Sequence, residues 1–595
     1  MLILLILSAL YFFSFFNRFA GLRSGNGEFG GGMALLTGRL PYRDFFNAGP
    51  PLNMMKAACE LWLFGKLLIV TRTCAVLERL TIAAILYAWL RRTFSSWASC
   101  IAALVTIIVS AGDRTDPLAS YNHDAILFAM LCGFAAGLSL ERPSLRNMIV
   151  LAFASGFAAG LSALTKQTVG LGTAVAIAVI GTAACLRLLG LRRSSAWLAF
   201  YLTGISVPIL AVAAFLAHLG VLSAALHMMF VSGPHAKATT PGMFVLREIG
   251  IASTVYRIWF FLGLAGLVLG ARVIWTGLHN SQPAAEAEKS HWRWLTIGGL
   301  VVVGTAEVLA LTSLPALHDF SKSSVYFTFL GTTFFGLALA DIALRGRSDS
   351  GRRIWQMLLL AATGWSVAFT LSLSFPAFEA MTLPGLGLLL AAAVDGAQMR
   401  SRVVLYCVMT CMVYMAVREK LDDPFAFDFQ DEPPVRFATH RSALPALRGM
   451  RLPEETVQLL DETVPAMQAA AASHEPVFTY PEMGILYALS GGNPPTFAAS
   501  HNIDVVSDDL ARQDAARLLQ NPPAVILYAR PDEAALHLQD VLWRGGKRSG
   551  QRDLVAALDR LVGHDIPADT FVLRTGDPPI RLYVRGNPRR QPSGP

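Results

Sequence analysis

Long apolar runs separated by short polar segments dominate the chain from Leu2 to Val417. Each run is roughly 15 to 24 residues long, close to the ~20 residues that an α-helix needs to cross about 30 Å of hydrocarbon. The pattern predicts about thirteen membrane-spanning helices. Their expected ranges are residues 2–16, 67–90, 97–110, 125–140, 148–164, 168–186, 196–217, 259–273, 294–314, 325–344, 354–374, 383–394 and 403–417.

The pattern changes after Val417, where helix-like and strand-like stretches of a soluble domain follow one another. A helix is expected after Pro453, and strands are expected at PVFTY, AVILYAR, FVLRT and IRLYVR. The last two strands flank a turn rich in Gly, Asp and Pro, which is typical of a hairpin. Further helices are expected directly after PVFTY and near residues 508–519 and 553–561. The chain is therefore predicted to be mainly α, with a polytopic transmembrane helical bundle in residues 1–417 and a small α/β domain in residues 418–595.

Basic residues gather in alternate short loops between the apolar runs. With a cytoplasmic N-terminus, about sixteen of them lie in cytoplasmic loops against about six in the opposite loops, as the positive-inside rule requires. Arg18 and Arg23, which follow the first run, oppose this orientation and are outweighed by the later loops. The first run lacks a basic n-region, so we expect a retained anchor. The prediction is a multi-pass protein of a bacterial inner membrane whose C-terminal domain is extracytoplasmic.

Composition narrows the classes of function. The 595 residues are 54% apolar and 15% charged, which is too apolar for an ordinary soluble protein,. Orientation in the membrane explains the net charge of +8, so no nucleic-acid partner is expected,. The seven cysteines form no CxxC pair, and no Walker A, HExxH or G-x-S-x-G sequence occurs,. Residues 25–30 spell G-x-G-x-x-G without a preceding strand, so we expect a flexible loop there.

The first loop outside the cytoplasm, residues 17–66, is too long and too rich in charge, glycine and aromatic residues for a simple connector. Pro51 can begin a helix and Gly65 can end it, so MMKAACELWLF is expected to lie on the membrane surface. The expected membrane-facing side chains are Leu52, Met55, Leu61 and Leu63. Such a loop can form the floor of a site at the membrane face. Elsewhere, GFAAGLS occurs at Gly133 and again at Gly156, and its GxxxG spacing favours close packing of helices in lipid.

Four motifs carry a resemblance to a known family. GRLPYRDFFNAGPPLN in the first loop, SYNHDAILF entering the fourth span, GLSALTKQTVGLG ending the fifth, and the later YPEMGILYALSGGNPPTF together resemble the glycosyltransferase C superfamily. The likeness is to its mannosyltransferase-like and aminoarabinose transferase-like bacterial members. It implies transfer of a sugar from a polyprenyl-phosphate carrier to a glycan, lipid or protein acceptor at the outer face of the inner membrane. It also implies that an acid of the first loop is the general base.

Two acids of the first loop are candidates for that base. Glu28 matches the family's first-loop acid by position, and Asp44 in YRDFF is the second candidate. Arg39, Arg43 and Lys56 are candidates for binding the donor phosphate, since a departing phosphate needs positive charge. The alternatives are a solvated Glu28 in a flexible turn, and an ion pair of Asp44 with one of the two arginines.

The sequence departs from the family pattern at two places. Gly27-Glu28-Phe29 stands where many relatives have paired acids, and AGPP stands where aminoarabinose transferases have an acid and a lysine before proline. The resemblance therefore leaves the identity of the base and the need for a metal open.

Other candidates lie where apolar runs meet the outer side. The candidate substrate-binding residues are Tyr121, His123, Lys166, His318 and Lys322. Asp113, Asp116 and Asp124 are close enough in sequence to hold a divalent metal ion, the only cofactor considered. Ordinary solvation of the acids and snorkelling of the lysines are the competing interpretations. Glu307 lies inside a predicted span, where a charge is costly unless paired or functional.

Two other classes of function compete with the transferase. A secondary transporter would concentrate polar groups near the bilayer midplane and often has two similar halves. A lipid-linked glycan ligase or polymerase would carry its long outer loop between late spans. Here the polar residues concentrate at the outer ends of the spans and the long loop comes first, which favours the transferase.

Overall fold

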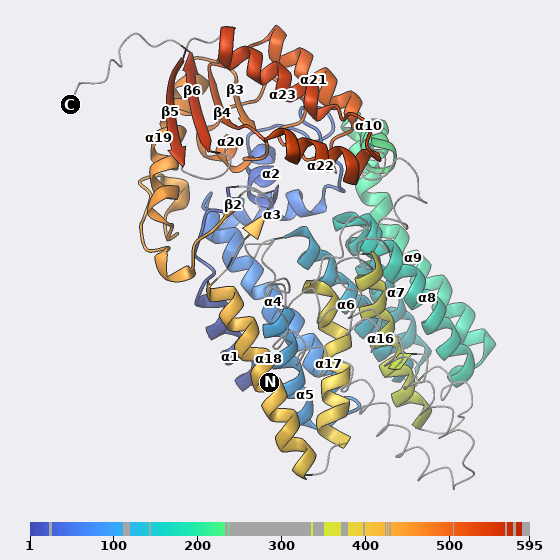
Figure 1. Cartoon of the computed structure of the whole chain (residues 1–595). Coiled ribbons are helices and arrows are strands. Elements are labelled where there is room, and N and C mark those ends of the chain that lie inside the picture. Colours follow the sequence, from blue (N-terminus) through green and yellow to red (C-terminus); the bar gives the residue numbers. More distant parts are fainter. Residues whose placement is uncertain are drawn as a thin grey trace.

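The computed structural model describes residues 1–22, 27–110, 120–141, 144–232, 236, 335, 336, 339, 350–370, 379–396, 399–422, 424, 426, 427, 430–503, 505–565, 568–574 and 579–585. Within them the chain forms a bundle of long helices with a small α/β domain at one end (Figure 1). The predicted fold class, mainly α with a small C-terminal α/β domain, is confirmed.

Ten helices form the bundle in the described part of the chain. They are α1 (Leu2–Phe13), α4 (Leu68–Leu90), α5 (Ser96–Ser110), α6 (Tyr121–Glu141), α7 (Leu145–Thr165), α8 (Gln167–Leu189), α9 (Leu191–His218), α16 (Ser350–Thr370), α17 (Glu379–Gly396) and α18 (Met399–Asp422). Each coincides with a predicted span, within a few residues at most ends. In the described part of the chain, α6, α7, α8 and α9 are long and apolar enough to cross a membrane. The predictions for residues 259–273 and 294–314 lie outside the described residues, as does almost all of 325–344.

Glycines let neighbouring helices of the bundle approach closely. A Cβ at Gly156 of α7 would collide with the backbone carbonyl of Tyr201 on α9, and one at Gly204 of α9 would collide with that of Phe153. At the other copy of the repeated motif, Gly133 of α6 lies against Trp89 and Thr363. Small residues matter here because lipid provides no hydrophobic force between helices, so backbone approach must supply the attraction. The GxxxG prediction is confirmed at both copies.

Two short helices of the first loop lie at the end of the bundle nearest the α/β domain (Figure 1). They are α2 (Gly27–Leu36) and α3 (Leu52–Phe64). The helix expected between Pro51 and Gly65 is confirmed, and Leu63 is exposed as predicted. Leu61 is buried, so its predicted contact with the membrane is wrong. It packs instead in a cluster that includes residues of the C-terminal domain.

The prediction of a flexible loop at residues 25–30 is wrong for residues 27–30, because α2 begins at Gly27, and residues 25 and 26 lie outside the described residues. A Cβ at Gly32 would lie 2.9 Å from the backbone N of Ala58 on α3, and one at Gly31 would lie 2.6 Å from Cγ of Met54. These glycines therefore serve close packing of α2 on α3. Glycine is common in flexible loops because its backbone is less restricted. In α2, glycine is needed instead because a side chain at Gly31 or Gly32 would collide with α3.

The C-terminal domain contains a four-stranded sheet in the order β3-β4-β6-β5. Its elements are β1 (Ala426–Phe427), β2 (Gln430–Asp431), α19 (Glu454–Ala472), β3 (Val477–Tyr480), α20 (Ile485–Ser490), α21 (Asp508–Gln520), β4 (Val525–Ala529), α22 (Glu533–Arg544), α23 (Gln551–Arg560), β5 (Ala568–Arg574) and β6 (Ile580–Arg585). Strands β3 and β4 are parallel, and the predicted hairpin of β5 and β6 is antiparallel. Helix α22 was not predicted from the sequence.

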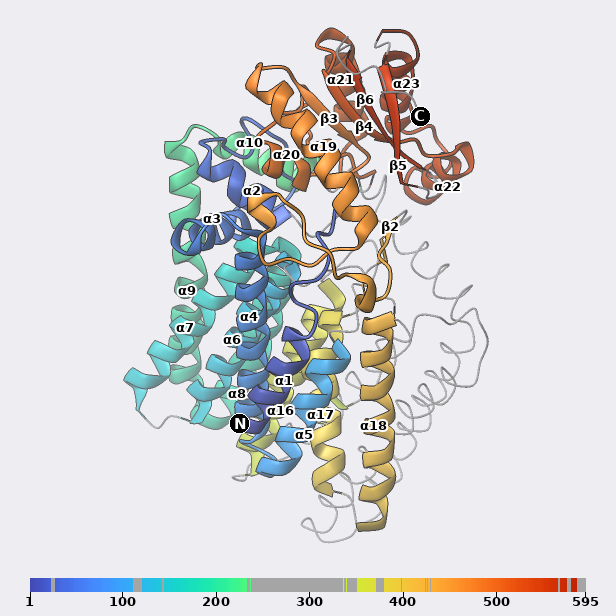
Figure 2. The same ribbon diagram turned by 90° about the vertical axis from the view of Figure 1, so that its left-hand side faces the viewer.

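Alternating side chains give the sheet two apolar faces. Val525 and Leu527 point to one face, while Ile526 and Tyr528 point to the other, as the two-residue period of a strand requires,. Helices α19 and α20 pack on the first face and α21 and α23 on the second (Figure 2). The first face is directed toward α2 and the membrane part.

Candidate functional site

The first turn of α6 contacts helix α2 of the first loop and the segment between α7 and α8. The backbone N–H of Tyr121 donates to Oε1 of Glu28 on α2 at 2.5 Å. Lys166, between α7 and α8, donates to Oδ1 of Asn122 at 2.7 Å, and its Nζ lies 4.9 Å from the centre of the Tyr121 ring. Glu28, Tyr121 and Lys166, which are far apart in the sequence, therefore come together.

Glu28 is buried, with 4% of its surface exposed. Its carboxylate accepts from the first residue of α6, where backbone N–H groups have no partner within the helix and the helix dipole is positive. Both features favour an ionised carboxylate. The alternative of a solvated acid in a flexible turn is therefore wrong, since Glu28 lies in the first turn of a helix and is shielded from water.

Lys56 of α3 is surrounded by three carboxylates. Its Nζ lies 2.5 Å from Oε1 of Glu78, 2.7 Å from Oδ1 of Asp124 and 3.5 Å from Oε1 of Glu60. Burial lowers the pKa of Lys56, but its ion pairs with Asp124 and Glu78 outweigh burial and hold the pKa above its ordinary value. Burial raises the pKa of Glu60. Lys56 is therefore engaged by three carboxylates in this structure, and its predicted contact with the donor phosphate stays a prediction.

Glu60 and Glu78 were missed by the sequence analysis. Glu60 lies on α3 one turn after Lys56, and Glu78 lies in the middle of α4 among apolar residues. The i,i+4 spacing of Lys56 and Glu60 indicates that the two side chains can pair. The position of Glu78 inside an apolar span indicates that it is paired or functional.

The predicted metal ligands do not form a site in the described residues. Asp113 and Asp116 lie outside them, and Asp124 is paired with Lys56. No group of three or more His, Cys, Asp or Glu side chains in the described part of the chain could hold a metal ion.

His123 faces the interior of the bundle. Its Nδ1 lies 3.3 Å from a guanidinium nitrogen of Arg79 on α4, and the residue is 3% exposed. Arg79 also lies over the ring of Phe12, 5.5 Å from its centre. His123 therefore makes a helix-to-helix contact, and its predicted contact with the substrate stays a prediction. The candidates His318 and Lys322, like Glu307, lie outside the described residues.

Asp44 belongs to a second, more exposed group in the first loop. It accepts from the backbone N of Leu40 at 2.7 Å and from two nitrogens of Arg43, each at 2.8 Å. The hydrogen bonds from Arg43 lower the pKa of Asp44. Arg39 lies over the ring of Phe45, 5.4 Å from its centre, and burial lowers its pKa. The ion pair anticipated as the alternative role of Asp44 is present, with Arg43 as its partner.

The loop around Asp44 is anchored on both sides. Tyr42 is buried against Leu216 of α9, Ala225 of α10 (Leu222–His227) and Met229. Phe46 donates its backbone N–H to the carbonyl of Phe497 in the C-terminal domain at 2.9 Å. The segment between these anchors therefore bridges the membrane part and the C-terminal domain.

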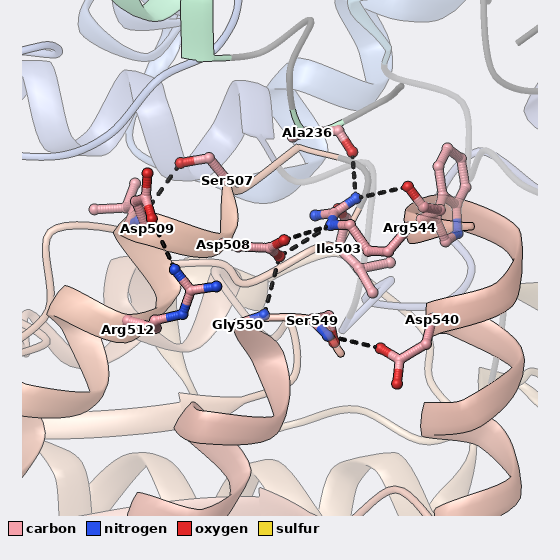
Figure 3. A network of polar contacts seen from close by, with 12 residues as sticks. Ala236, Ile503, Ser507, Asp508, Asp509, Arg512, Asp540, Arg544, Ser549 and Gly550 are labelled. Atoms are coloured by element: carbon pink, nitrogen blue, oxygen red, sulfur yellow. Dashed lines mark hydrogen bonds and ion pairs between the residues drawn. The ribbon is translucent and has the colours of Figure 1, made fainter. Parts of the chain in front are cut away.

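Arg544 at the end of α22 makes another contact between the two parts (Figure 3). Its guanidinium donates to the carbonyl of Ala236 at 2.7 Å, to both carboxylate oxygens of Asp508 at 2.9 Å, and to the carbonyl of Ile503 at 3.0 Å. Since Arg544 is only 4% exposed, these hydrogen bonds are shielded from water and strengthened,. The C-terminal domain is thus fixed to the membrane part at several separate places.

Comparison with known proteins gives matches only among solved structures. No family model and no curated protein matches the chain. Two crystal structures of ArnT from Cupriavidus metallidurans, one bound to undecaprenyl phosphate and one in the apo state, align over 100% of this chain and 99% of theirs, with 10% and 11% identity and TM-scores of 0.43. The Archaeoglobus fulgidus oligosaccharyltransferase in complex with zinc and sulfate aligns over 92% of this chain and 70% of its own, with 10% identity and a TM-score of 0.41.

Proposed function

We propose that this membrane protein is a glycosyltransferase that moves a sugar from a polyprenyl-phosphate carrier to a glycan, lipid or protein acceptor at the outer face of the inner membrane. The motifs of the first loop support the class of reaction through their resemblance to the glycosyltransferase C superfamily. The burial of Glu28 at the first turn of α6, beside Lys166 and beneath the C-terminal domain, is the observation that carries the proposal.

In this proposal Glu28 is the general base. The acceptor hydroxyl oxygen attacks the anomeric carbon of the donor, and Glu28 takes the hydroxyl proton. The bond from the anomeric carbon to the phosphate oxygen breaks, and the polyprenyl phosphate leaves with the electron pair. The backbone N–H of Tyr121 and the positive end of the α6 dipole favour the carboxylate form that this role needs, while burial opposes it,.

Lys166 is the proposed partner of the donor phosphate. Its Nζ donates to the amide oxygen of Asn122 and lies over the ring of Tyr121, at the same first turn of α6 that binds Glu28. In this position an ammonium group stabilises the negative charge that develops on the leaving phosphate. Lys56, held among three carboxylates, is assigned no such role.

Asp44 is assigned to the shape of the loop. The backbone N–H of Leu40 and the guanidinium of Arg43 already engage its oxygens, and a carboxylate of lowered pKa is a weaker base,. Arg39 and Arg43 remain candidates for contacts with the donor or the acceptor.

The test is transfer by the purified protein in lipid nanodiscs. The donor is undecaprenyl phosphate linked to a labelled hexose or pentose, and delipidated cell-envelope extract supplies the acceptors. We expect Glu28→Gln to lower the transfer rate by about 10² to 10⁴-fold, the usual contribution of a general base. The matched control is Glu475→Gln, which changes an exposed glutamate of the C-terminal domain.

Full activity of Glu28→Gln would remove Glu28 from the mechanism. Uptake of a sugar by sealed vesicles, without release of polyprenyl phosphate, would favour a transporter instead.

A further inference from the structure

The first loop completes one face of the C-terminal sheet. Five residues near the start of the chain are buried in the same hydrophobic cluster as Leu459 and Leu460 of α19, Val525 and Leu527 of β4, and Leu486 of α20. These five are Ala20, Leu22, Phe29, Leu61 and Leu68. The cluster on the opposite face, as far as the described residues show, contains only residues of the C-terminal domain. The two faces of one sheet therefore have different partners.

Phe29 of α2 is buried in this shared cluster, and Met33 and Leu36 of the same helix pack against it. Phe29 is 1% exposed, and the next residue, Gly30, would place a Cβ 3.8 Å from the carbonyl oxygen of Gly484, just before α20. Both views show α2 beside α20 (Figures 1 and 2). Met483 and Leu486, on either side of that contact, are 1% and 0% exposed. Helix α2 therefore rests on the segment that begins α20.

Glu28 and Phe29 are consecutive residues of one helix, so their side chains diverge by about 100° around its axis. Phe29 is directed into the core of the C-terminal domain, and Glu28 is directed to the backbone N–H of Tyr121 on α6. A helix is rigid over two residues. Any displacement of α2 on α20 therefore moves the carboxylate of Glu28 by a similar amount.

We propose that the C-terminal domain positions Glu28 at the first turn of α6 through the packing of Phe29 against α20, with Leu486 as a positioning residue. This inference rests on the proposed role of Glu28 as the base. The C-terminal domain then packs on α2 at Phe29, and α3 packs on α2 at Gly32. Helix α2 is therefore held between the C-terminal domain and α3.

The experiment compares matched leucines on the two faces of the sheet. Leu486→Ala removes a fully buried side chain from the face shared with α2, and Leu558→Ala removes one from α23 on the other face. Both substitutions create a cavity of the same chemical kind in the same domain, so both destabilise it. Only the first removes a side chain from the cluster that contains Phe29 of α2. Leu486→Met, which conserves volume, is the rescue variant.

Two measurements are made on the full-length protein in nanodiscs. Hydrogen exchange follows the backbone amides of α2, residues 27–36. Steady-state transfer with the labelled undecaprenyl-phosphate sugar gives kcat and KM for the donor. For Leu486→Ala we expect at least tenfold faster exchange in α2. We also expect kcat to fall roughly 10 to 100-fold with KM nearly unchanged, since a small misplacement of a catalytic group has effects of that size.

Leu558→Ala should leave the exchange of α2 and the value of kcat within about twofold of the wild type, and Leu486→Met should restore both. Equal acceleration of α2 exchange in the two alanine variants, or none in Leu486→Ala, would overturn the positioning role. A wild-type protein that transfers no sugar would overturn the proposed function alone. The exchange comparison would still decide whether the C-terminal domain holds α2.

Discussion

The two candidate bases of the first loop, Glu28 and Asp44, stand in different surroundings. Glu28 is buried and accepts from Tyr121, a residue 93 positions away in the sequence. Asp44 has 30% of its side chain exposed, and its partners Leu40 and Arg43 are at most four residues away. An acid whose partners are local can shape its loop with little help from the rest of the fold. An acid whose partner comes from a distant helix depends on the packing of every element between them.

Two basic residues of the first loop, Arg43 and Lys56, also differ in whether their partners are near or distant in the sequence. Arg43 is held by its neighbour Asp44 at the surface, whereas Lys56 draws its three acids from α3, α4 and α6. The side chains of Glu60, Glu78 and Asp124 are only 13%, 14% and 3% exposed, so leaving these carboxylates without Lys56 in a low dielectric is costly,. The following variants compare side chains whose partners are distant in the sequence with side chains whose partners are neighbours. They are ordered by the expected loss of stability.

Lys56→Met should have the largest effect. It leaves Glu60, Glu78 and Asp124 close together without the cation between them, and we expect a loss of about 3 kcal/mol in the free energy of unfolding. Thermal unfolding in detergent is the measurement, with Lys56→Arg as the control that keeps the charge. The double variant Lys56→Met/Glu78→Gln should recover part of the loss, because it removes one repelling carboxylate. Unchanged stability of Lys56→Met would mean that the cluster contributes nothing to the fold.

Gly32→Ala should have the next largest effect. Its Cβ would lie 2.9 to 3.1 Å from the backbone and Cβ of α3, so α2 must shift away from α3, at a cost of about 2 kcal/mol,. The rate of sugar transfer should fall with it, since Glu28 is on the shifted helix. Gly484→Ala is the matched control, because nothing lies within 4 Å of its added Cβ. Equal behaviour of the two variants would show that close packing is not the reason for the glycines of α2.

The sequence alone predicts those elements that are determined by residues close together in the chain. Spans such as α7 and α8 follow from run length, and α3 follows from Pro51 and Gly65. An ion pair of Asp44 with Arg39 or Arg43 is the alternative role that the sequence offers for this acid, and the structure shows the pair with the adjacent Arg43. These features need no knowledge of distant parts of the chain.

The remaining features depend on contacts between distant residues. The glycines of α2 indicated a loop because the approach of α3 is invisible in a single sequence. Likewise, Lys56 seemed available for a phosphate because Glu78 and Asp124 join it only after α4 and α6 have packed. Periodicity shows that Phe478 and Val477 face opposite sides of a strand. It does not show that the first loop covers one of those sides.

Glu28→Gln should separate the two roles of the buried acid. Glutamine can still accept from Tyr121 but loses the charge that suits the helix end, so the expected cost in stability is about 0.5 to 1 kcal/mol. The expected loss of transfer rate is far larger, because an amide cannot take a proton from a hydroxyl. The two losses are compared by thermal unfolding and by the transfer assay on the same preparation. A small loss of rate, in proportion to the loss of stability, would leave Glu28 with a capping role only.

Asp44→Asn should have the smallest effect, about 0.5 kcal/mol, because its ion pair with Arg43 is partly exposed,. The pKa of Asp44 is lower in the folded protein than its ordinary value near 3.9, so its contribution is present above that value,. It is lost as the pH falls through the folded pKa. The difference in stability between the wild type and Asp44→Asn should therefore be constant from pH 7 to 5 and should close below about pH 4. Arg43→Gln should remove the same pH-dependent difference, since it removes the main cause of the shift. A difference that instead grew on acidification would contradict the local ion pair.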